Sequence, residues 1–185
     1  AYAEGIQDET DERKRQKYSE IIISETERMG MLIETLLDLS ALENGAVSLM
    51  PERFDFVEFV ETIAGRLLID MPEIDFELQY ELPEHKVFVY TDKQRMEQVL
   101  DNLIVNGKKN VSPKGILRLS LIEQDNMLHF SIYNQGASIP AEKLPKIWDK
   151  FYRDKNAKYN GSGLGLAIVA QILSMQDLEY GAENL

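Results

Sequence analysis

The stretch NGSGLGLAIV, residues Asn160 to Val169, has three glycines at alternate positions ahead of an apolar run. Glycine has no Cβ and tolerates positive φ, so a glycine cluster lets the backbone approach another group closely. The N-terminus of a helix also offers unpaired N–H groups and a partial positive charge, and both favour an anion. Gly161, Gly163 and Gly165 are therefore a candidate phosphate cradle, with an ordinary flexible loop as the alternative.

The spacing of this cluster excludes two better-known phosphate loops. A G-x-x-x-x-G-K-[ST] loop needs a lysine after its last glycine, but Leu166 follows Gly165. The dinucleotide fingerprint G-x-G-x-x-G should follow a strand near the start of a βαβ unit, whereas this cluster lies near the end of the chain. The rest of the sequence has to show what these glycines approach.

Composition limits the classes of protein to which the chain can belong. It has 185 residues, 44% of them hydrophobic, which is enough for one compact core with a helical appendage. With 32 acidic and 20 basic residues, the net charge of −12 disfavours nucleic acid and anionic membrane and suits a basic protein partner. The absence of cysteine excludes disulfides and thiolate metal sites. No apolar run approaches the about 18 residues of a membrane span, so we expect this chain to be soluble.

The first 45 residues have a helical pattern. A heptad-like stripe is apolar apart from two glutamates and predicts a long helix, and a second apolar line widens its face beyond a two-helix seam. The charged segment before the stripe indicates a turn from an earlier helix. Two chains pairing such hairpins would form a homodimeric four-helix bundle over residues 1–45; the alternative is a helix that covers the next domain of its own chain. The stripe comprises Tyr18, Ile22, Glu25, Met29, Leu32, Leu36, Leu39 and Glu43, and the second line Ile21, Ile33, Leu37 and Leu42.

From residue 46 to residue 185 the pattern mixes helix and strand. The order of elements predicts an α+β fold, a two-layer α/β sandwich with helices on one face of a sheet. Asp92 should cap the central helix, and Asp125-Asn126 should form a hairpin turn. The expected elements are a strand within Val47–Asp55, a helix Phe56–Leu68, strands in IDFELQYEL and KVFVYTD, a helix Asp92–Val111, strands GILRLSLIEQ and MLHFSIYN, helices Ala141–Asp149 and Leu166–Ser174, and a strand near Glu179.

The predicted central helix has a polar face. Asn102 and Asn106 are four residues apart, so both amides emerge on one side, and Lys109 follows three residues later. Asparagine is a poor residue in the middle of a helix because it competes for backbone hydrogen bonds. Oxygen donors beside a lysine suit Mg²⁺ bound to a triphosphate. A solvated polar face is the alternative.

The segment YNQGASIP, residues 133–140, follows a predicted strand. Asn134 offers a donor and an acceptor that match the edge of adenine, and Gly136 lets the chain turn away. An ordinary Asn-x-Gly turn is the alternative interpretation.

Four segments in this order resemble the N, G1, F and G2 boxes of sensor histidine kinases, whose ATP-binding domain is of the gyrase and heat-shock chaperone type. They are NLIVN, NQGASIP, WDKFYR and GSGLGLAIV. The resemblance covers nearly the whole chain, because the N-terminal helices resemble the family's dimerisation hairpin, and it extends to the vancomycin-resistance sensors. It implies ATP and Mg²⁺ as cofactors, a homodimer, and transfer of the γ-phosphoryl to a histidine and on to an aspartate of a response-regulator receiver domain.

The resemblance also assigns roles to positions in this sequence. Asn106 would bind Mg²⁺, Asn102 and Lys109 would contact the phosphates, Arg153 would reach the terminal phosphate, and Asn134 would contact adenine. Trp148 would pack the base of a short ATP lid over residues 154–160. The other nucleotide-binding positions would be Gly136, Ile139, Phe151, Gly161, Gly163, Leu164 and Gly165.

Several departures from the family pattern bear on function. Asn134 stands in place of the usual aspartate and Ser138 in place of a second glycine, which weakens the case for tight adenine binding. The resemblance places the acceptor histidine upstream of Ala1, and His85 and His129 have the sequence context of ordinary surface or sheet residues. We therefore expect the cytoplasmic part of a sensor kinase whose membrane attachment lies in upstream segments.

Two other functions compete with this interpretation. A degenerate ATP-fold module that serves only as a dimerising scaffold would share the sequence pattern, and Mg²⁺-dependent ATP binding would separate the two. A hydrolysing chaperone or topoisomerase module would need a glutamate base, but Asn102 occupies that position.

Overall fold

The computed structural model describes residues 11–69, 75–153 and 161–185, and it divides into two compact units, Ala1–Asn44 and Gly45–Leu185. The described part of the first unit is one helix, α2 (Glu12–Glu43), of 32 residues. The carboxylate of Asp11 caps it by accepting hydrogen bonds from the backbone N–H groups of Arg13, at 2.9 Å, and Lys14, at 3.4 Å.

The start of α2 corrects one prediction. The charged residues before Tyr18 are predicted to form a turn, but from Glu12 onward they are helical. The helix begins before the apolar stripe because Asp11 caps it there. The earlier helix of the predicted hairpin falls mostly on residues 1–10, which lie outside the described residues. Beyond the C-cap residue Asn44, Gly45 has a φ of +66°, the left-handed conformation that commonly ends a helix.

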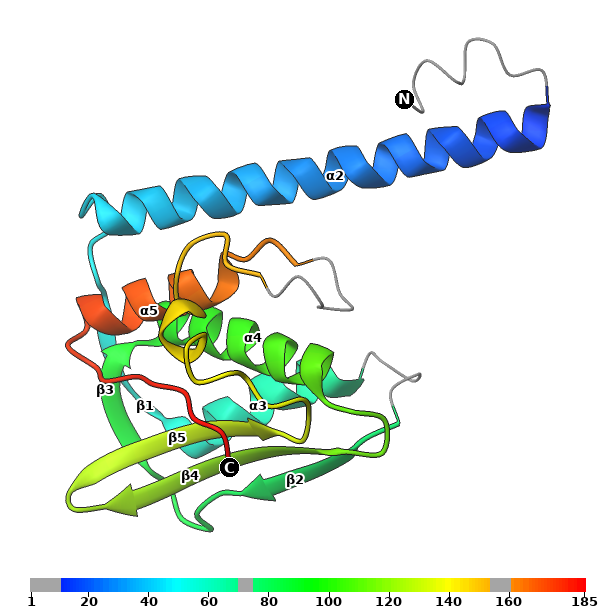
Figure 1. Cartoon of the computed structure of the whole chain (residues 1–185). Coiled ribbons are helices and arrows are strands. Elements are labelled where there is room, and N and C mark those ends of the chain that lie inside the picture. The colour runs from blue at the N-terminus through cyan, green and yellow to red at the C-terminus, as the bar shows by residue number, and fades with distance from the viewer. Residues whose placement is uncertain (1–10, 70–74, 154–160) are drawn as a thin grey trace. The chain divides into compact units, whose positions relative to one another are not determined.

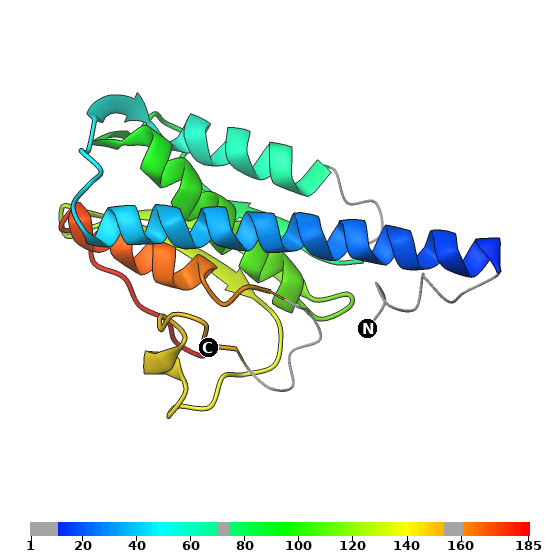
Figure 2. The same cartoon turned by 90° about the horizontal axis from the view of Figure 1, so that it is seen from above.

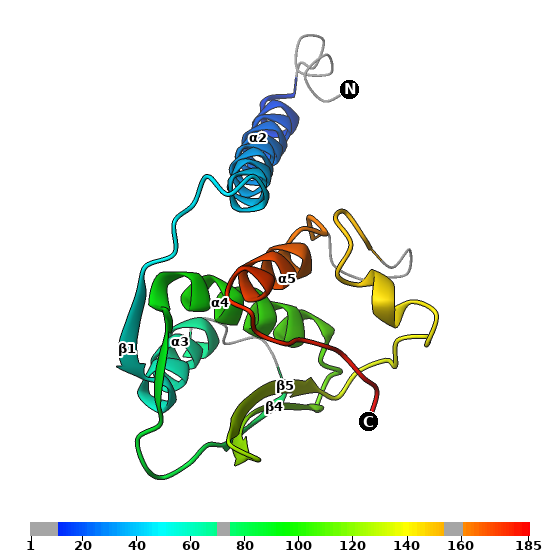
Figure 3. The same ribbon diagram turned by 90° about the vertical axis from the view of Figure 1, so that its left-hand side faces the viewer.

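The second unit is a two-layer α+β fold, as predicted (Figure 1). The three-stranded sheet, of order β2-β4-β5, forms one layer, and β1 and β3 form a separate two-stranded sheet. The helices α3, α4 and α5 form the other layer, on one side of the larger sheet, and α4 lies between α3 and α5 (Figure 2 and Figure 3). The bounds are β1 (Pro51–Asp55), α3 (Phe56–Ile69), β2 (Glu77–Glu81), β3 (Phe88–Asp92), α4 (Lys93–Asn110), β4 (Ile116–Gln124), β5 (Met127–Asn134), a 3-10 turn η1 (Leu144–Lys146) and α5 (Gly165–Met175).

Strand pairing follows from the hydrophobic pattern and the turns. β2 runs parallel to β4, and β4 and β5 are antiparallel, with Leu117 opposite Asn134. Asp125 and Asn126 both have positive φ, 53° and 61°, which is the requirement of a two-residue hairpin turn whose twist matches its strands. The predicted hairpin is therefore confirmed.

The core lies between the helices and the larger sheet. Alternate residues of β4, namely Leu117, Leu119 and Leu121, are buried and face the helices. Gly107 of α4 packs so closely on the sheet that a Cβ there would lie 2.9 Å from Leu117 Cδ1. The buried helix residues opposite include Val60, Ile63 and Ala64 on α3, Val99, Leu100 and Ile104 on α4, and Ile168, Val169 and Ile172 on α5.

Two predicted elements are wrong. The helix expected over Ala141–Asp149 is reduced to η1 and flanking turns, because Pro145 lacks the N–H and clashes with the preceding turn of an α-helix. The strand expected near Glu179 is absent from the described residues 178–185, which follow α5 after a turn with positive φ at Asp177. Side-chain contacts rather than a strand ladder hold this C-terminal segment, as described below.

Within the described ranges, no helix combines the length and the apolar character that crossing a membrane requires.

Candidate functional site

The polar face of α4 carries the first group of predicted site residues. Asp92 caps the helix by accepting a hydrogen bond from the N–H of Arg95 at 3.0 Å, and the apolar side of α4 is buried. The opposite side carries Asn102, which is half-buried, and Asn106 and Lys109, which are exposed. The three residues therefore share one side of α4, as their spacing predicts.

Asn102 lies at the contact between α4 and α5. Its Nδ2 donates to the carbonyl oxygen of Gln98 at 2.8 Å, which fixes the orientation of the amide. Its Oδ1 then faces the first residue of α5, Gly165, where an added Cβ would lie only 2.6 Å away. Two predicted site residues, one from each helix, are thus in direct contact, and the contact requires glycine at position 165.

Asn106 is the predicted metal ligand. Its Oδ1 accepts a hydrogen bond of 3.1 Å from the Nδ2 of Asn110, which also donates to the Asn106 carbonyl oxygen at 2.8 Å. An amide oxygen has two lone pairs, so Oδ1 can accept this bond and still face a cation. Its exposure and hard oxygen donor fit a Mg²⁺ ion that takes its remaining ligands from phosphates and water.

The turn after β5 lies directly against the end of α4. A Cβ on Gly136 would overlap the carbonyl oxygen of Asn110 and lie 3.0 Å from Asn134 Nδ2. The turn is held by two backbone hydrogen bonds, from Ser112 N to the Gln135 oxygen at 2.8 Å and from Gln135 N to the Ile116 oxygen at 2.7 Å. Gly136 thus permits a backbone approach that brings Asn134 to the same end of α4 as Asn110.

A third close approach joins the WDKFYR segment to the glycine cluster. Gly163 has a φ of +72°, its carbonyl oxygen accepts a hydrogen bond from Phe151 N at 2.8 Å, and a Cβ on it would lie 2.8 Å from the Tyr152 oxygen. Phe151 also has positive φ, and the residue is 60% exposed. The backbone of Phe151, rather than its ring, therefore makes the contact.

The remaining predicted positions differ in how they relate to this site. Leu164 is 1% exposed and belongs to the core, while Gly161 has no atom within 4 Å of an added Cβ. Arg153 is exposed and precedes residues 154–160, so the predicted lid lies outside the described residues. Trp148 packs edge-on against Tyr180, with 4.9 Å between ring centroids.

Two residues that the sequence patterns did not point to hold these segments. The side chain of Asn184 accepts a hydrogen bond from Ile139 N at 2.9 Å and donates to the Ile139 oxygen at 2.7 Å. Gln176 bonds the end of α5 to Asp92. Both contacts join residues more than 40 positions apart, and no local motif signals them.

The part of the chain that the structure describes contains no cluster of three or more acidic, histidine or cysteine residues able to hold a metal ion. On another side of α4, hydrogen bonds and charge from Glu97 and Asp101 raise the pKa of Arg66 on α3. The arginine contacts them at 2.6 and 2.7 Å and ties α3 to α4. A hollow lined by Ile116, Arg118, Tyr133, Gln135 and Leu185 lies on the larger sheet; Tyr133 and Gln135 flank Asn134, but none of the predicted site residues lines it.

Comparison with known proteins identifies relatives over the full chain. The chain is 31% identical over 191 residues to the sensor histidine kinase WalK of Bacillus subtilis, covering 100% of this chain and 31% of that protein. It is 34% identical over 168 residues to the sensor protein kinase WalK of Staphylococcus epidermidis, covering 87% of this chain and 27% of the relative. The chain thus spans about a third of the length of these curated relatives.

Solved structures of histidine kinases also resemble this chain. The Acinetobacter baumannii histidine kinase AdeS is 27% identical, with a TM-score of 0.71 over 94% of this chain and 80% of that one. The histidine kinase ThkA, solved in complex with the response regulator TrrA, is 20% identical with a TM-score of 0.68 over 82% of this chain and 45% of that one, which shows a shared fold.

The family model for the histidine kinase-, DNA gyrase B-, and HSP90-like ATPases matches residues 91–184, from the end of β3 to the C-terminal segment. This range is about half of the chain and includes α4, the turn after β5 and α5 with its glycines. The predicted resemblance to sensor histidine kinases is confirmed at this level, while the narrower resemblance to vancomycin-resistance sensors stays a prediction. The chain belongs to the histidine kinase-, DNA gyrase B-, and HSP90-like ATPase family.

Proposed function

We propose that residues 46–185 bind ATP with Mg²⁺ and that the whole protein is a sensor histidine kinase. In this proposal the γ-phosphoryl of ATP passes to a histidine and then to an aspartate of a response-regulator receiver domain. The observation that carries it is the pair of close approaches on α4: Gly165 against Asn102, and Gly136 against Asn110. Asn106 and Lys109 lie between Asn102 and Asn110, which are about 12 Å apart along the helix.

The face of α4 between these two close approaches suits a nucleotide that lies along the helix. Asn134 and Gly136 would receive the adenine at one end, and the backbone N–H groups at the start of α5 would face the phosphates at the other. The amide oxygen of Asn106 would share Mg²⁺ with the phosphates between them. The ammonium of Lys109 and the guanidinium of Arg153 would offset phosphate charge.

Phosphoryl transfer depends mostly on positioning and on stabilising charge. The chain's own residues would hold the triphosphate so that its terminal phosphorus is within about 3–3.5 Å of an attacking nitrogen. We propose that residues 1–45 belong to the dimerisation and phosphotransfer helices and residues 46–185 to the catalytic ATP-binding domain. A histidine on the dimerisation helices of the whole protein would be the acceptor.

Exposed apolar side chains along α2 support the dimer. Ile23, Met29, Ile33 and Leu37 are between 56% and 64% exposed, an unusual density for the surface of a single helix. A second copy of α2 in a four-helix bundle would bury them. We propose a homodimer on this basis, and, from the resemblance to sensor histidine kinases, a membrane-attached protein whose kinase part faces the cytoplasm.

The first test is a calorimetric titration with ATP in the presence and absence of Mg²⁺. The proposal expects saturable one-site binding that weakens when Mg²⁺ is chelated. A degenerate scaffold would give no heat of binding, or binding that is indifferent to Mg²⁺, and either result would overturn the proposed function.

A further inference from the structure

A polar junction lies where the end of α5 meets the start of α4. Gln176, the first residue after α5, accepts two hydrogen bonds at Oε1: one of 2.9 Å from the backbone N–H of Asp92, and one from the hydroxyl of Thr91. Its Nε2 donates to the carbonyl oxygen of Ile172 at 3.5 Å and lies 3.8 Å from Met96 Sδ. One side chain therefore bonds α5 to both β3 and the residue that caps α4.

Asp92 extends this junction. It is only 6% exposed, and its two carboxylate oxygens accept different backbone N–H groups: Oδ1 that of Arg95 in the first turn of α4, and Oδ2 that of Met50 just before β1. The backbone N–H of the same residue is the one that Gln176 binds. The start of α4 is thus fixed to the end of α5 through directional hydrogen bonds.

The geometry of α5 connects this junction to the candidate site. The helix begins at Gly165, which lies against Asn102, and ends beside Gln176, which is bonded to Asp92. An 11-residue helix of about 16 Å is stiff, so a shift at one end moves the other end with it. The buried residues of α5, namely Ala167, Ile168, Val169, Ile172 and Leu173, are apolar, and apolar contacts are non-directional.

We propose that Gln176 is a positioning residue that sets the register of α5 on α4, and thereby places the backbone of Gly163 and Gly165 for the phosphate groups of the nucleotide. This proposal rests on the proposed function for its ligand. The placement itself, Gly165 against Asn102, can be measured without any nucleotide.

The first experiment follows amide signals by NMR in the chain without nucleotide. Gln176→Met keeps the volume of the side chain and removes the acceptor, so the Gly165 backbone amide and the Asn102 side-chain amide should shift, while the Gly136 amide should not. Gln176→Glu keeps the acceptor oxygen but loses the Nε2 donor to Ile172, so it should move both signals less than Gln176→Met does. Gln171→Met makes the same change at a half-buried position of the same helix and should leave all three signals in place.

The second experiment measures ATP binding by the same variants. A misplacement of about 1 Å can cost up to ~10²-fold in a positioned contact, so we expect Gln176→Met to weaken ATP binding by about tenfold. Gln176→Glu should recover part of the loss, and Gln171→Met should bind as the wild type does. If Gln176→Met folds and leaves the Gly165 and Asn102 signals unmoved, or if Gln171→Met moves them as far, the positioning role is overturned.

Two further outcomes keep the two proposals distinguishable. If Gln176→Met does not fold, Thr91→Val is the substitute, because it removes one donor to the same Gln176 oxygen with little change of shape. Thr91→Val should fold and should move the Gly165 amide signal. An unmoved Gly165 signal would overturn the positioning role. A wild-type chain that binds no ATP would overturn the proposed function, while the amide signals would still decide whether Gln176 sets the register.

Discussion

Gly165 lies directly against Asn102, so that a Cβ added to the glycine would stand 2.6 Å from the Oδ1 of the asparagine. Asn102 cannot easily turn aside, because its Nδ2 is bonded to the Gln98 carbonyl oxygen. The contact is therefore a packing constraint on α4 and α5 as well as part of the candidate site.

We expect Gly165→Ala to force α5 away from α4. Overpacking of this kind costs about 1–3 kcal/mol, more than the 0.5–1 kcal/mol or so that alanine gains over glycine in a helix. Urea unfolding should show the lower stability, and ATP binding should weaken in parallel. Gly181→Ala is the matched control, because an added Cβ there meets nothing within 4 Å. Equal stability of the two variants would contradict the packing constraint.

The second prediction concerns Mg²⁺. Asn106→Leu removes the proposed oxygen ligand from an exposed position, so ATP affinity should become independent of Mg²⁺ while the thermal midpoint changes little. Asn106→Asp retains an oxygen donor and should keep the dependence on Mg²⁺. Gln124→Leu removes an exposed amide at the far end of β4 and should behave as the wild type. Calorimetry with and without Mg²⁺ measures all three, and a Mg²⁺ effect of wild-type size in Asn106→Leu would rule out this ligand.

The third prediction concerns assembly through α2. Ile33→Glu with Leu37→Glu would place two charges on the exposed apolar face, and burying them in a bundle without partners would cost several kcal/mol. The dimer should dissociate while the circular dichroism of the ATP-binding unit stays unchanged. Thr26→Glu, at an exposed polar position of the same helix, is the control. Light scattering after gel filtration decides, and a wild-type chain that is monomeric at high concentration would count against the bundle.

The fourth prediction concerns a buried lysine. Lys108 is only 6% exposed, and its ammonium donates to the carbonyl oxygen of Leu67 in the last turn of α3. Lys108→Met leaves this acceptor without its donor, so the free energy of unfolding should fall by about 1–3 kcal/mol. Lys109→Met is the neighbouring exposed control and should change stability by less than about 0.5 kcal/mol. Urea titrations of the pair test this, and similar midpoints would show that the Lys108 bond contributes little.

Local signals explain which elements could be predicted from sequence. The helix α4 has a capping aspartate and a clean apolar period, and the β4–β5 hairpin has Asp125-Asn126 at its turn, so nearby residues determine both. The stretch Ala141–Asp149 has helical composition, but Pro145 interrupts its hydrogen bonds.

The candidate site, too, could be predicted from the sequence only where local signals mark its residues. Its polar residues stand out because asparagines are unusual on a helix face. The contacts that bring the segments together depend on single backbone approaches at Gly136, Gly163 and Gly165. The bonds of Gln176 and Asn184 span long stretches of chain and leave no local pattern, so only the three-dimensional structure reveals them.

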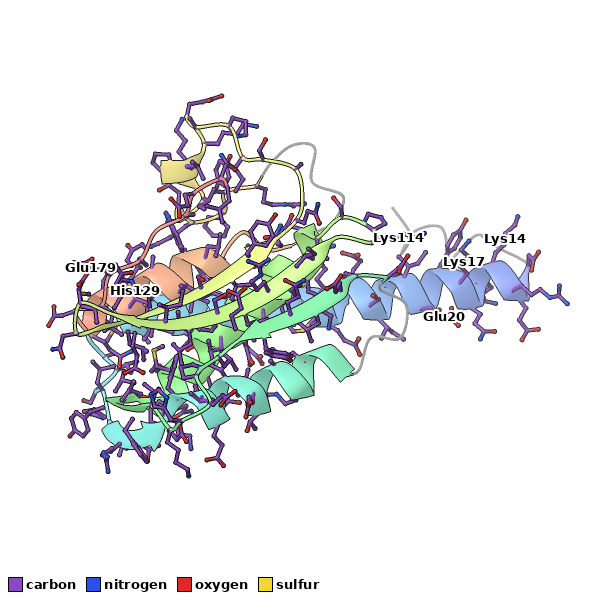
Figure 4. All side chains as sticks on the ribbon, turned by 90° about the horizontal axis from the view of Figure 1, so that it is seen from below. Lys14, Lys17, Glu20, Lys114, His129 and Glu179 are labelled. Carbon is purple, nitrogen blue, oxygen red and sulfur yellow. The ribbon has the colours of Figure 1, made fainter. Side chains whose placement is uncertain are left out.

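The last prediction is that this chain binds Mg·ATP without forming phosphohistidine on either of its histidines. An acceptor nitrogen has to reach the γ-phosphate in line, at about 3–3.5 Å. His85 lies in the loop before β3, where its Nε2 is 2.9 Å from Glu123 Oε1, and that glutamate belongs to the β4 end near the hairpin turn. His129 pairs with Ile122 near the same turn. Figure 4 shows it at the end of the hairpin opposite Lys114, which follows α4.

Both histidines therefore lie at the end of the sheet away from Gly136 and the end of α4, with the rigid hairpin fixing that separation. Incubation with γ-labelled ATP should give no acid-labile label on the chain, while the whole protein, whose dimerisation helices carry the proposed acceptor, should become labelled. Replacing both histidines, His85→Gln and His129→Gln, should leave ATP affinity unchanged. Acid-labile label that maps to His85 or His129 in the wild type, and disappears in the double variant, would overturn this assignment of the acceptor.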